Sequence, residues 1–219
     1  MFLTSPPRRA EIDEYAIKFL IGLIALALPV AELCLVPGGI DSISASFWYA
    51  STPPLMGLWA RNVFVGLLFA IAGLLLTYNG QSAWEMWLTK VAAAAAILIA
   101  MFPCACGCKE REILPLVHTG AAAAMFGVLA VFCCWFTARA WRKREKEPVA
   151  LVRAAIYLLC LGGMLVAIAL FGVEAWGRNV IVDQVFWAET IGLVSFGISW
   201  LTASHWVPGI NAQRKPLFA

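Results

Sequence analysis

The amino-acid sequence predicts an all-α, polytopic membrane helix bundle with six transmembrane helices. Of its 219 residues, 62% are apolar and 13% are charged, whereas a soluble domain is about 45–50% apolar and about 25% charged. The apolar residues come in runs close to the roughly 20 residues that a helix needs to cross a bilayer. They also occupy every face of these runs, unlike the one-sided helices of a soluble bundle. These observations exclude a disordered protein and a water-soluble enzyme.

Six segments have the required length and hydropathy, and we expect them to span the membrane at 15–36, 60–78, 86–103, 116–138, 151–173 and 184–206. The run from Val91 to Met101 does not alternate between polar and apolar residues, as a barrel strand would. Lys90 lies one turn inside the third span, where its amine can still extend to the interface. We therefore expect one transmembrane domain over 15–206, with tails at 1–14 and 207–219.

The distribution of Lys and Arg predicts the orientation of the bundle. With a cytoplasmic N-terminus, twelve of the 16 basic residues fall on the cytoplasmic side and four outside, namely Arg61, Lys109, Arg111 and Arg178. Because Lys and Arg concentrate on the cytoplasmic side of membrane proteins, both termini should be cytoplasmic. A multi-pass protein of the cell inner membrane is the expected localisation.

Two connections are unusual. The first outer loop, 37–59, is long and contains a serine-rich stretch, and long loops often carry binding or lid functions. The cytoplasmic loop 139–150 is basic, and together with Arg153 it could attract anionic lipid. A determinant of topology is the simpler explanation of those charges.

Six polar side chains at the outer ends of the spans, or in the first outer loop, form a candidate ligand-binding set: Glu32, Arg61, His118, Glu189, Ser42 and Ser44. A charge inside a span costs at least about 2.5–3.5 kcal/mol at the bilayer centre, so such residues normally pair or line a wet cavity. We expect Arg61 to pair with Glu189 or Glu32. Structural ion pairs that hold the bundle in register and an outward-facing polar pocket would both produce this pattern.

Three functions are consistent with this set. The first is non-enzymatic binding of a lipid headgroup or small ligand, or docking of a membrane partner, with Arg61 as the anion contact. The second is a membrane-embedded hydrolase in which Ser42 or Ser44 acts with His118, provided that the serine lies within hydrogen-bond reach of the base. The third is an accessory subunit that docks through small residues at 121–124. Membrane lipids, a membrane protein partner or a second copy are the expected partners, and nucleic acid is not.

No cofactor is expected, and the metal signal is weak. His118 and His205 should lie at opposite ends of the bundle, whereas a catalytic zinc site needs about three converging ligands. Cys104, Cys106 and Cys108 alternate in an outer connection, where a disulfide is plausible in an oxidising compartment. Alternate cysteines could also bind a soft metal such as Cu(I).

Three short motifs resemble a known group of six-helix bacterial membrane proteins. Ser42-Ile43-Ser44 follows the first span, Phe102-Pro103 closes the third, and His118 opens the fourth. In this layout the chain resembles proteins of the domain-of-unknown-function 998 type and, more distantly, the Frag/DRAM/Sfk group. An acidic residue commonly follows the Phe-Pro in that family, whereas this chain has Cys104 there. The resemblance implies an integral membrane protein without an assigned reaction.

Overall fold

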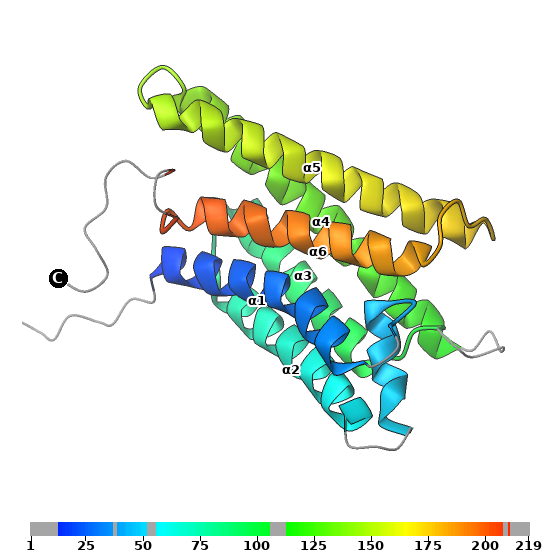
Figure 1. Cartoon of the computed structure of the whole chain (residues 1–219). Helices are drawn as coiled ribbons and strands as arrows, with labels where there is room; N and C mark the ends of the chain where they lie inside the picture. Colours follow the sequence, from blue (N-terminus) through cyan, green and yellow to red (C-terminus); the bar gives the residue numbers. More distant parts are fainter. Residues whose placement is uncertain (1–12, 37–38, 52–55, 106–112, 208–209, 211–219) are drawn as a thin grey trace, which may run out of the picture.

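The chain folds into six long α-helices and one short 3-10 helix, as the computed structural model shows (Figure 1). The structure describes residues 13–36, 39–51, 56–105, 113–207 and 210. The α-helices are α1 (Glu14–Leu35), α2 (Met56–Thr77), α3 (Ala83–Met101), α4 (Ile113–Lys143), α5 (Pro148–Ala175) and α6 (Gln184–Ala203). The 3-10 helix η1 (Ile43–Ser51) lies between α1 and α2. The described residues form no β-strand.

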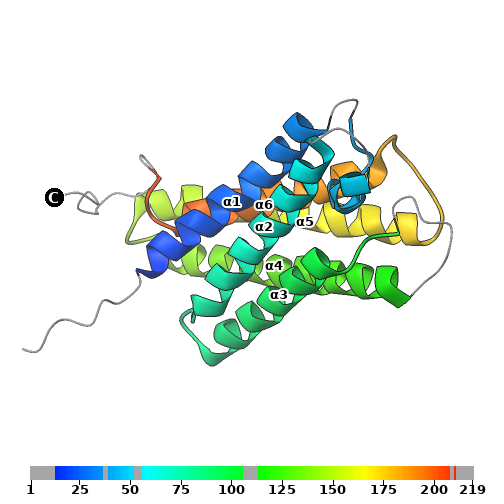
Figure 2. The same cartoon turned by 90° about the horizontal axis from the view of Figure 1, so that it is seen from below.

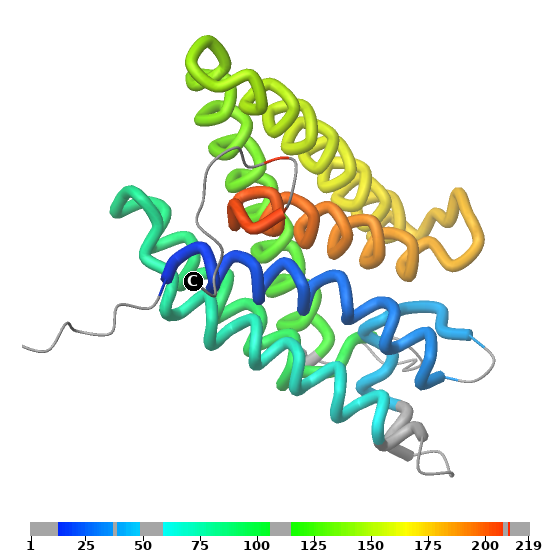
Figure 3. Tube along the Cα trace, turned by 60° about the vertical axis from the view of Figure 1, so that its left-hand side comes forward, coloured from blue at the N-terminus to red at the C-terminus, as the bar shows by residue number. Residues whose placement is uncertain are grey.

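All six α-helices are long and apolar enough to cross a membrane, so the predicted number of spans and the helical class are confirmed. Consecutive helices pack against each other, and α6 closes the bundle by packing on α1 as well as α5. Figure 3 shows α6 between α1 on one side and the α4–α5 pair on the other. The protein is therefore a multi-pass membrane bundle in which α6 is the central helix.

Glycine allows the closest approach within this bundle. A Cβ atom built on Gly197 of α6 would lie 2.9 Å from the carbonyl oxygen of Gly22 on α1, and a Cβ on Gly22 would lie 2.8 Å from the carbonyl oxygen of Gly197. Small residues let helix backbones meet in this way when lipid offers no hydrophobic drive for association. Gly22 and Gly197 thus determine how tightly α1 packs on α6.

The two ends of the bundle differ in what they carry. One end, on the left in Figure 1, holds the start of α1, the end of α6 and the α4–α5 turn. The α2–α3 turn lies at that end too (Figure 2). The opposite end holds η1, the end of α3, the start of α4 and the α5–α6 connection. The candidate residues of the sequence prediction lie toward this second end, which we call the η1 end.

Two connections differ from the predicted ones. The stretch expected to be a loop at 37–59 contains η1, and α2 begins at Met56; residues 37–38 and 52–55 lie outside the described part. The basic segment 139–150 is mostly helical, because α4 runs to Lys143 and α5 begins at Pro148. Basic residues suit the negative C-terminal end of a helix dipole, and proline is favoured in the first turn of a helix.

Candidate functional site

The carboxyl group of Glu189 joins α6 to the beginning of η1. The Ser42 hydroxyl and the Ile43 backbone N–H donate to Oε2, at 2.9 and 2.5 Å. The Ser44 backbone N–H lies 3.3 Å from Oε1, and the Ser44 hydroxyl also bonds to that oxygen. The first N–H groups of a helix have no acceptor within it, so the Glu189 side chain caps η1 from a helix 145 residues away in the chain.

His118 on α4 reaches the same serine from the other side. Its Nδ1 lies 2.8 Å from the carbonyl oxygen of Phe102, and its Nε2 lies 3.2 Å from the Ser44 hydroxyl oxygen. A carbonyl oxygen only accepts hydrogen bonds, so Nδ1 carries a proton and donates it. In a neutral ring this leaves the Nε2 lone pair directed at Ser44. The carbonyl of Phe102, just after α3, thus sets the tautomer of His118.

The hydrogen bonds at Ser44 allow two arrangements of the same protons. In the first, Glu189 is protonated and donates to the Ser44 oxygen, while the Ser44 hydroxyl donates to His118 Nε2. In the second, the Ser44 hydroxyl donates to the Glu189 carboxylate and receives a bond from a doubly protonated His118. Both contain the same number of protons. The Ser44 hydroxyl therefore links an acid and a base by a path along which one proton can move.

The side chains of this cluster are largely buried. Ser42, Ser44, His118 and Glu189 are each less than 9% exposed. Hydrogen bonds in a low-dielectric surrounding are stronger than in water, and an unpaired polar group there is costly. We call these four residues the Ser44 cluster; they come from η1, the residue before it, α4 and α6.

Arg61 does not join this cluster. Within the part of the chain that the structure describes, it forms no ion pair with Glu189 or Glu32, so the expected pairing is not found. Its guanidinium lies instead over the ring of Phe47 in η1, with 4.5 Å between Cζ and the ring centroid. Cation–π contacts of this kind satisfy a cation without a carboxylate. The Glu189 carboxyl group is instead bound by neutral hydroxyl and backbone N–H groups.

Glu32, near the end of α1, is a second buried carboxyl group at this end. It is 0% exposed, and neither of its carboxyl oxygens has a hydrogen-bond partner among the described residues. The hydroxyl of Ser46, also fully buried, is the polar side chain that acts on this carboxyl group. Buried polar groups are almost always paired with protein or ordered water. Glu32 and Ser46 thus form a buried polar pair whose remaining hydrogen-bonding capacity is not taken up by other described residues.

The cysteines at the η1 end contribute one covalent link. Cys104 is disulfide-bonded, and its carbonyl oxygen accepts a hydrogen bond of 3.1 Å from the Trp48 indole in η1. Cys34 is a free, exposed thiol. Cys106 and Cys108 lie outside the described residues. Among the residues described, no group of three or more His, Cys, Asp or Glu side chains is placed to hold a metal ion.

The small-residue face at 121–124 is divided. Ala121 is buried, while Ala123 and Ala124 are exposed on α4. Gly120 and Gly127 on the same helix have open space around them. Exposed small residues of this kind let a second helix approach closely.

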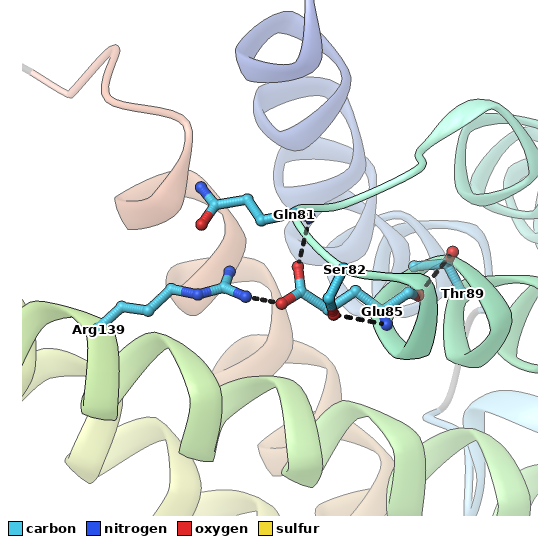
Figure 4. Close-up of polar contacts among 5 residues, drawn as sticks. All are labelled: Gln81, Ser82, Glu85, Thr89 and Arg139. Carbon is cyan, nitrogen blue, oxygen red and sulfur yellow. Dashed lines mark hydrogen bonds and ion pairs between the residues drawn. The ribbon is translucent and has the colours of Figure 1, made fainter.

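The sequence analysis missed two polar contacts at the opposite end. Lys90 donates to the carbonyl oxygens of Leu76 and Tyr78, at 2.5 and 3.0 Å, and so caps the end of α2. Glu85 pairs with Arg139 of α4 and accepts a hydrogen bond of 2.9 Å from the Gln81 backbone (Figure 4). The Ser-x-x-Glu pattern at 82–85 is a known signal for a helix start, and Ser82 does cap α3. No sequence signal pointed to Arg139 as the partner of Glu85.

The relation of this chain to known proteins was tested in three ways. Comparison with protein-family models, with curated proteins and with solved structures finds no match. The resemblance to the domain-of-unknown-function 998 type therefore stays a prediction. Inferences about function rest on the geometry of the chain itself.

Proposed function

We propose that this protein performs acid–base chemistry at Ser44, as a membrane-embedded hydrolase or acyltransferase that acts on an ester or amide. One observation carries the proposal: Ser44 Oγ lies 3.2 Å from His118 Nε2, while His118 Nδ1 is held by the Phe102 carbonyl. A serine becomes nucleophilic when a neighbouring base takes its proton and a third group orients that base. Here the backbone carbonyl fills the orienting role that a carboxylate has in the Ser-His-Asp triad.

The proposed reaction proceeds in two halves. Ser44 Oγ attacks the substrate carbonyl carbon as its proton passes to His118 Nε2. His118 returns that proton to the leaving oxygen or nitrogen, and the acyl group stays on Ser44. Water, or an acceptor hydroxyl, then attacks the acyl group with His118 again as base, which releases the product and restores Ser44. Before the attack, a protonated Glu189 donates to the Ser44 oxygen, which leaves the Ser44 proton directed at His118 Nε2.

An activity-based probe tests this proposal. The purified full-length protein in lipid nanodiscs is treated with a fluorophosphonate, which labels activated serines, and mass spectrometry locates the adduct. We expect an adduct on Ser44, and labelling at least about 100-fold slower in His118→Asn, since a positioned base contributes about 10²–10⁴-fold. Ser199→Ala is the matched control, because Ser199 is a buried serine of α6 that donates to the Phe196 carbonyl of its own helix and has no histidine among its hydrogen-bond partners in the described part of the chain.

Two results would contradict a hydrolase. One is the absence of an Ser44 adduct in wild-type protein that unfolds cooperatively on heating, which shows that it is folded. The other is an adduct whose rate does not change in a folded His118→Asn variant. In both cases the Ser44 cluster would be a structural cap for η1 and no more.

Binding of a lipid headgroup or small ligand is the second candidate function, and the buried pair of Glu32 and Ser46 favours it. A ligand with N–H or ammonium donors would satisfy both groups, and Arg61 on α2 would supply the contact for its anionic part. Phosphatidylethanolamine has such a headgroup. In nanodiscs it should raise the Tm above that in phosphatidylcholine, and Glu32→Gln should abolish the difference. Glu174→Gln is the matched control, because Glu174 is an exposed carboxylate at the same end.

The orientation in the membrane is part of the proposal. The η1 end faces outward and both termini face the cytoplasm of a cell with an inner membrane, which the positions of Lys and Arg support. One added cysteine at each of two exposed positions tests it in a Cys34→Ala/Cys134→Ala background, with labelling read above that of the same background without the added cysteine: Asp41→Cys at the η1 end and Glu145→Cys in the α4–α5 turn. A membrane-impermeant maleimide should label only Asp41→Cys in intact cells. Labelling of Glu145→Cys alone would reverse the orientation.

A further inference from the structure

A basic cavity lies at the end of the bundle opposite to the Ser44 cluster. It has a volume of about 230 Å³, many times the roughly 10–15 Å³ that one water needs by the same kind of measure. Its walls come from α1, the α2–α3 turn, α4, α5 and the end of α6. The lining is Lys18, Gln81, Phe136, Arg139, Ala140, Arg142, Lys143, Arg153, Tyr157, Ala203 and His205.

The lining carries a strong excess of positive charge. Five of its residues are Lys or Arg, and none is a carboxylate. Two nearby carboxylates each pair with one of the cations, Glu85 with Arg139 (Figure 4) and Glu147 with Arg153. No carboxylate in the described part of the chain forms an ion pair with Arg142 or Lys143. The cavity is therefore suited to an anion.

Two of these cations are held rigidly in the wall. Lys18 and Arg153 are each 5% exposed. The Lys18 amine lies 5.1 Å from the ring centroids of Tyr15 and of Tyr78. One Arg153 nitrogen lies 3.1 Å from His205 Nδ1, and the Arg153 Nε has no hydrogen-bond partner among the described residues. Burying a charged side chain is costly unless its donors are satisfied. The Arg153 Nε–H group therefore still needs a hydrogen-bond acceptor.

His205 is held in a conformation that places it against Arg153. Its φ is 59°, in the left-handed region that residues other than glycine seldom occupy. Such a conformation persists only when the surrounding structure imposes it. The ring packs edge-on against Tyr15 of α1, with 5.2 Å between centroids. Residues from α1, from α5 and from the segment just after α6 thus meet beside the cavity.

We propose that this basic cavity binds a phosphate group, carried by an anionic phospholipid or by a free phosphate compound. Phosphate offers several acceptor oxygens, which match the donors of guanidinium groups, and lysine adds a compact charge. Under the proposed orientation the cavity opens toward the cytoplasmic leaflet, where anionic lipids attract basic residues. The inference does not depend on the chemistry proposed for Ser44.

Two probes distinguish the sources of phosphate. The full-length protein in a neutral detergent is titrated with inorganic phosphate or with short-chain phosphatidylglycerol, and binding is followed by native mass spectrometry and by Tm. We expect one saturable site for at least one probe. Stabilisation by phosphatidylglycerol alone identifies a lipid headgroup as the ligand, whereas stabilisation by inorganic phosphate as well identifies a free phosphate group. A lack of saturable binding for either probe overturns the proposal.

Matched charge pairs separate the cavity from the basic turn next to it. Arg142→Gln/Lys143→Gln removes two exposed cations that line the cavity, and Arg144→Gln/Lys146→Gln removes two exposed cations of the same segment that do not. The first double variant should bind the probe about tenfold or more weakly, since each nearby cation contributes on the order of fivefold. The second should bind as the wild type does. Equal weakening in both would show diffuse attraction to the turn and overturn the site.

Discussion

The two ends of the bundle treat buried charge in opposite ways. At the η1 end, Glu189 is surrounded by hydroxyl and backbone N–H donors, and no ion pair reaches it among the described residues. At the opposite end, cations outnumber carboxylates. They lie over aromatic rings, donate to helix carbonyls or line the basic cavity. Neutral donors leave a carboxyl group free to gain or lose a proton, whereas a basic cavity favours a bound anion. The difference separates a candidate site for proton transfer from a candidate site for binding.

The largest expected effect is a loss of stability at the η1 end when Glu189 is replaced. Glu189→Leu leaves two hydroxyls and two backbone N–H groups without their acceptor. Each buried unsatisfied donor costs about 1–3 kcal/mol, so with partial rearrangement the free energy of unfolding should fall by about 3–5 kcal/mol. Glu189→Gln keeps one acceptor oxygen and should lose less. Denaturation in detergent followed by circular dichroism measures both, with Glu174→Leu as the exposed control. An unchanged stability of Glu189→Leu would show that η1 does not depend on this carboxyl group.

An intermediate effect tests the ion pair at the opposite end. Glu85 is 1% exposed, and its partner Arg139 is 28% exposed. A double-mutant cycle with Glu85→Gln and Arg139→Gln should give a coupling energy of about 1–3 kcal/mol, because contacting residues in one network are not additive. The exposed pair of Arg144 and Glu145 provides the comparison, and should give less than about 1 kcal/mol. Equal coupling in both cycles would mean that burial does not strengthen the inner pair.

The smallest expected effect concerns Arg61. Its one described partner is the Phe47 ring, and such contacts contribute about 0.5–1 kcal/mol where they are exposed. Arg61→Gln should therefore lower the free energy of unfolding by about 1 kcal/mol or less, and Phe47→Leu by a similar amount from the lost cation–π contact alone. A loss above about 3 kcal/mol for Arg61→Gln would indicate that this cation does stabilise Glu32 or Glu189. The contrast between the two ends would then disappear.

Much of the architecture was predictable because hydropathy acts locally. The six spans follow from the cost of placing a polar residue in hydrocarbon, and each predicted span overlaps an observed helix. The boundaries differ most at α4, which continues through basic residues to Lys143. A hydropathy criterion ends the span where charges begin, whereas the helix continues because Arg and Lys are good helix formers. The length of a span and the length of its helix are separate quantities.

The contacts of the candidate site were less accessible to sequence reasoning. The sequence indicated that Glu32, Arg61, His118, Glu189, Ser42 and Ser44 belong to one end of the bundle. Charge alone favoured an ion pair with Arg61, because an ion pair is the usual way to satisfy a buried carboxylate. The N-terminus of η1 competes for Glu189 with a set of converging donors, and a 3-10 helix within the long loop was not expected. Because η1 forms, Glu189 binds the N-terminus of η1 instead of Arg61.

The sequence by itself determined that this is a six-helix membrane protein with polar side chains near one end and an excess of basic residues near the other. Those properties depend on the transfer of single side chains and short segments from water to hydrocarbon, which needs no knowledge of neighbours. Only the tertiary structure decided that Ser44 lies between Glu189 and His118, and that Lys18, Arg139 and Arg153 share one cavity. These contacts join residues far apart in the chain. They therefore depend on which helices pack together and on how the helices are shifted relative to one another along the bundle axis.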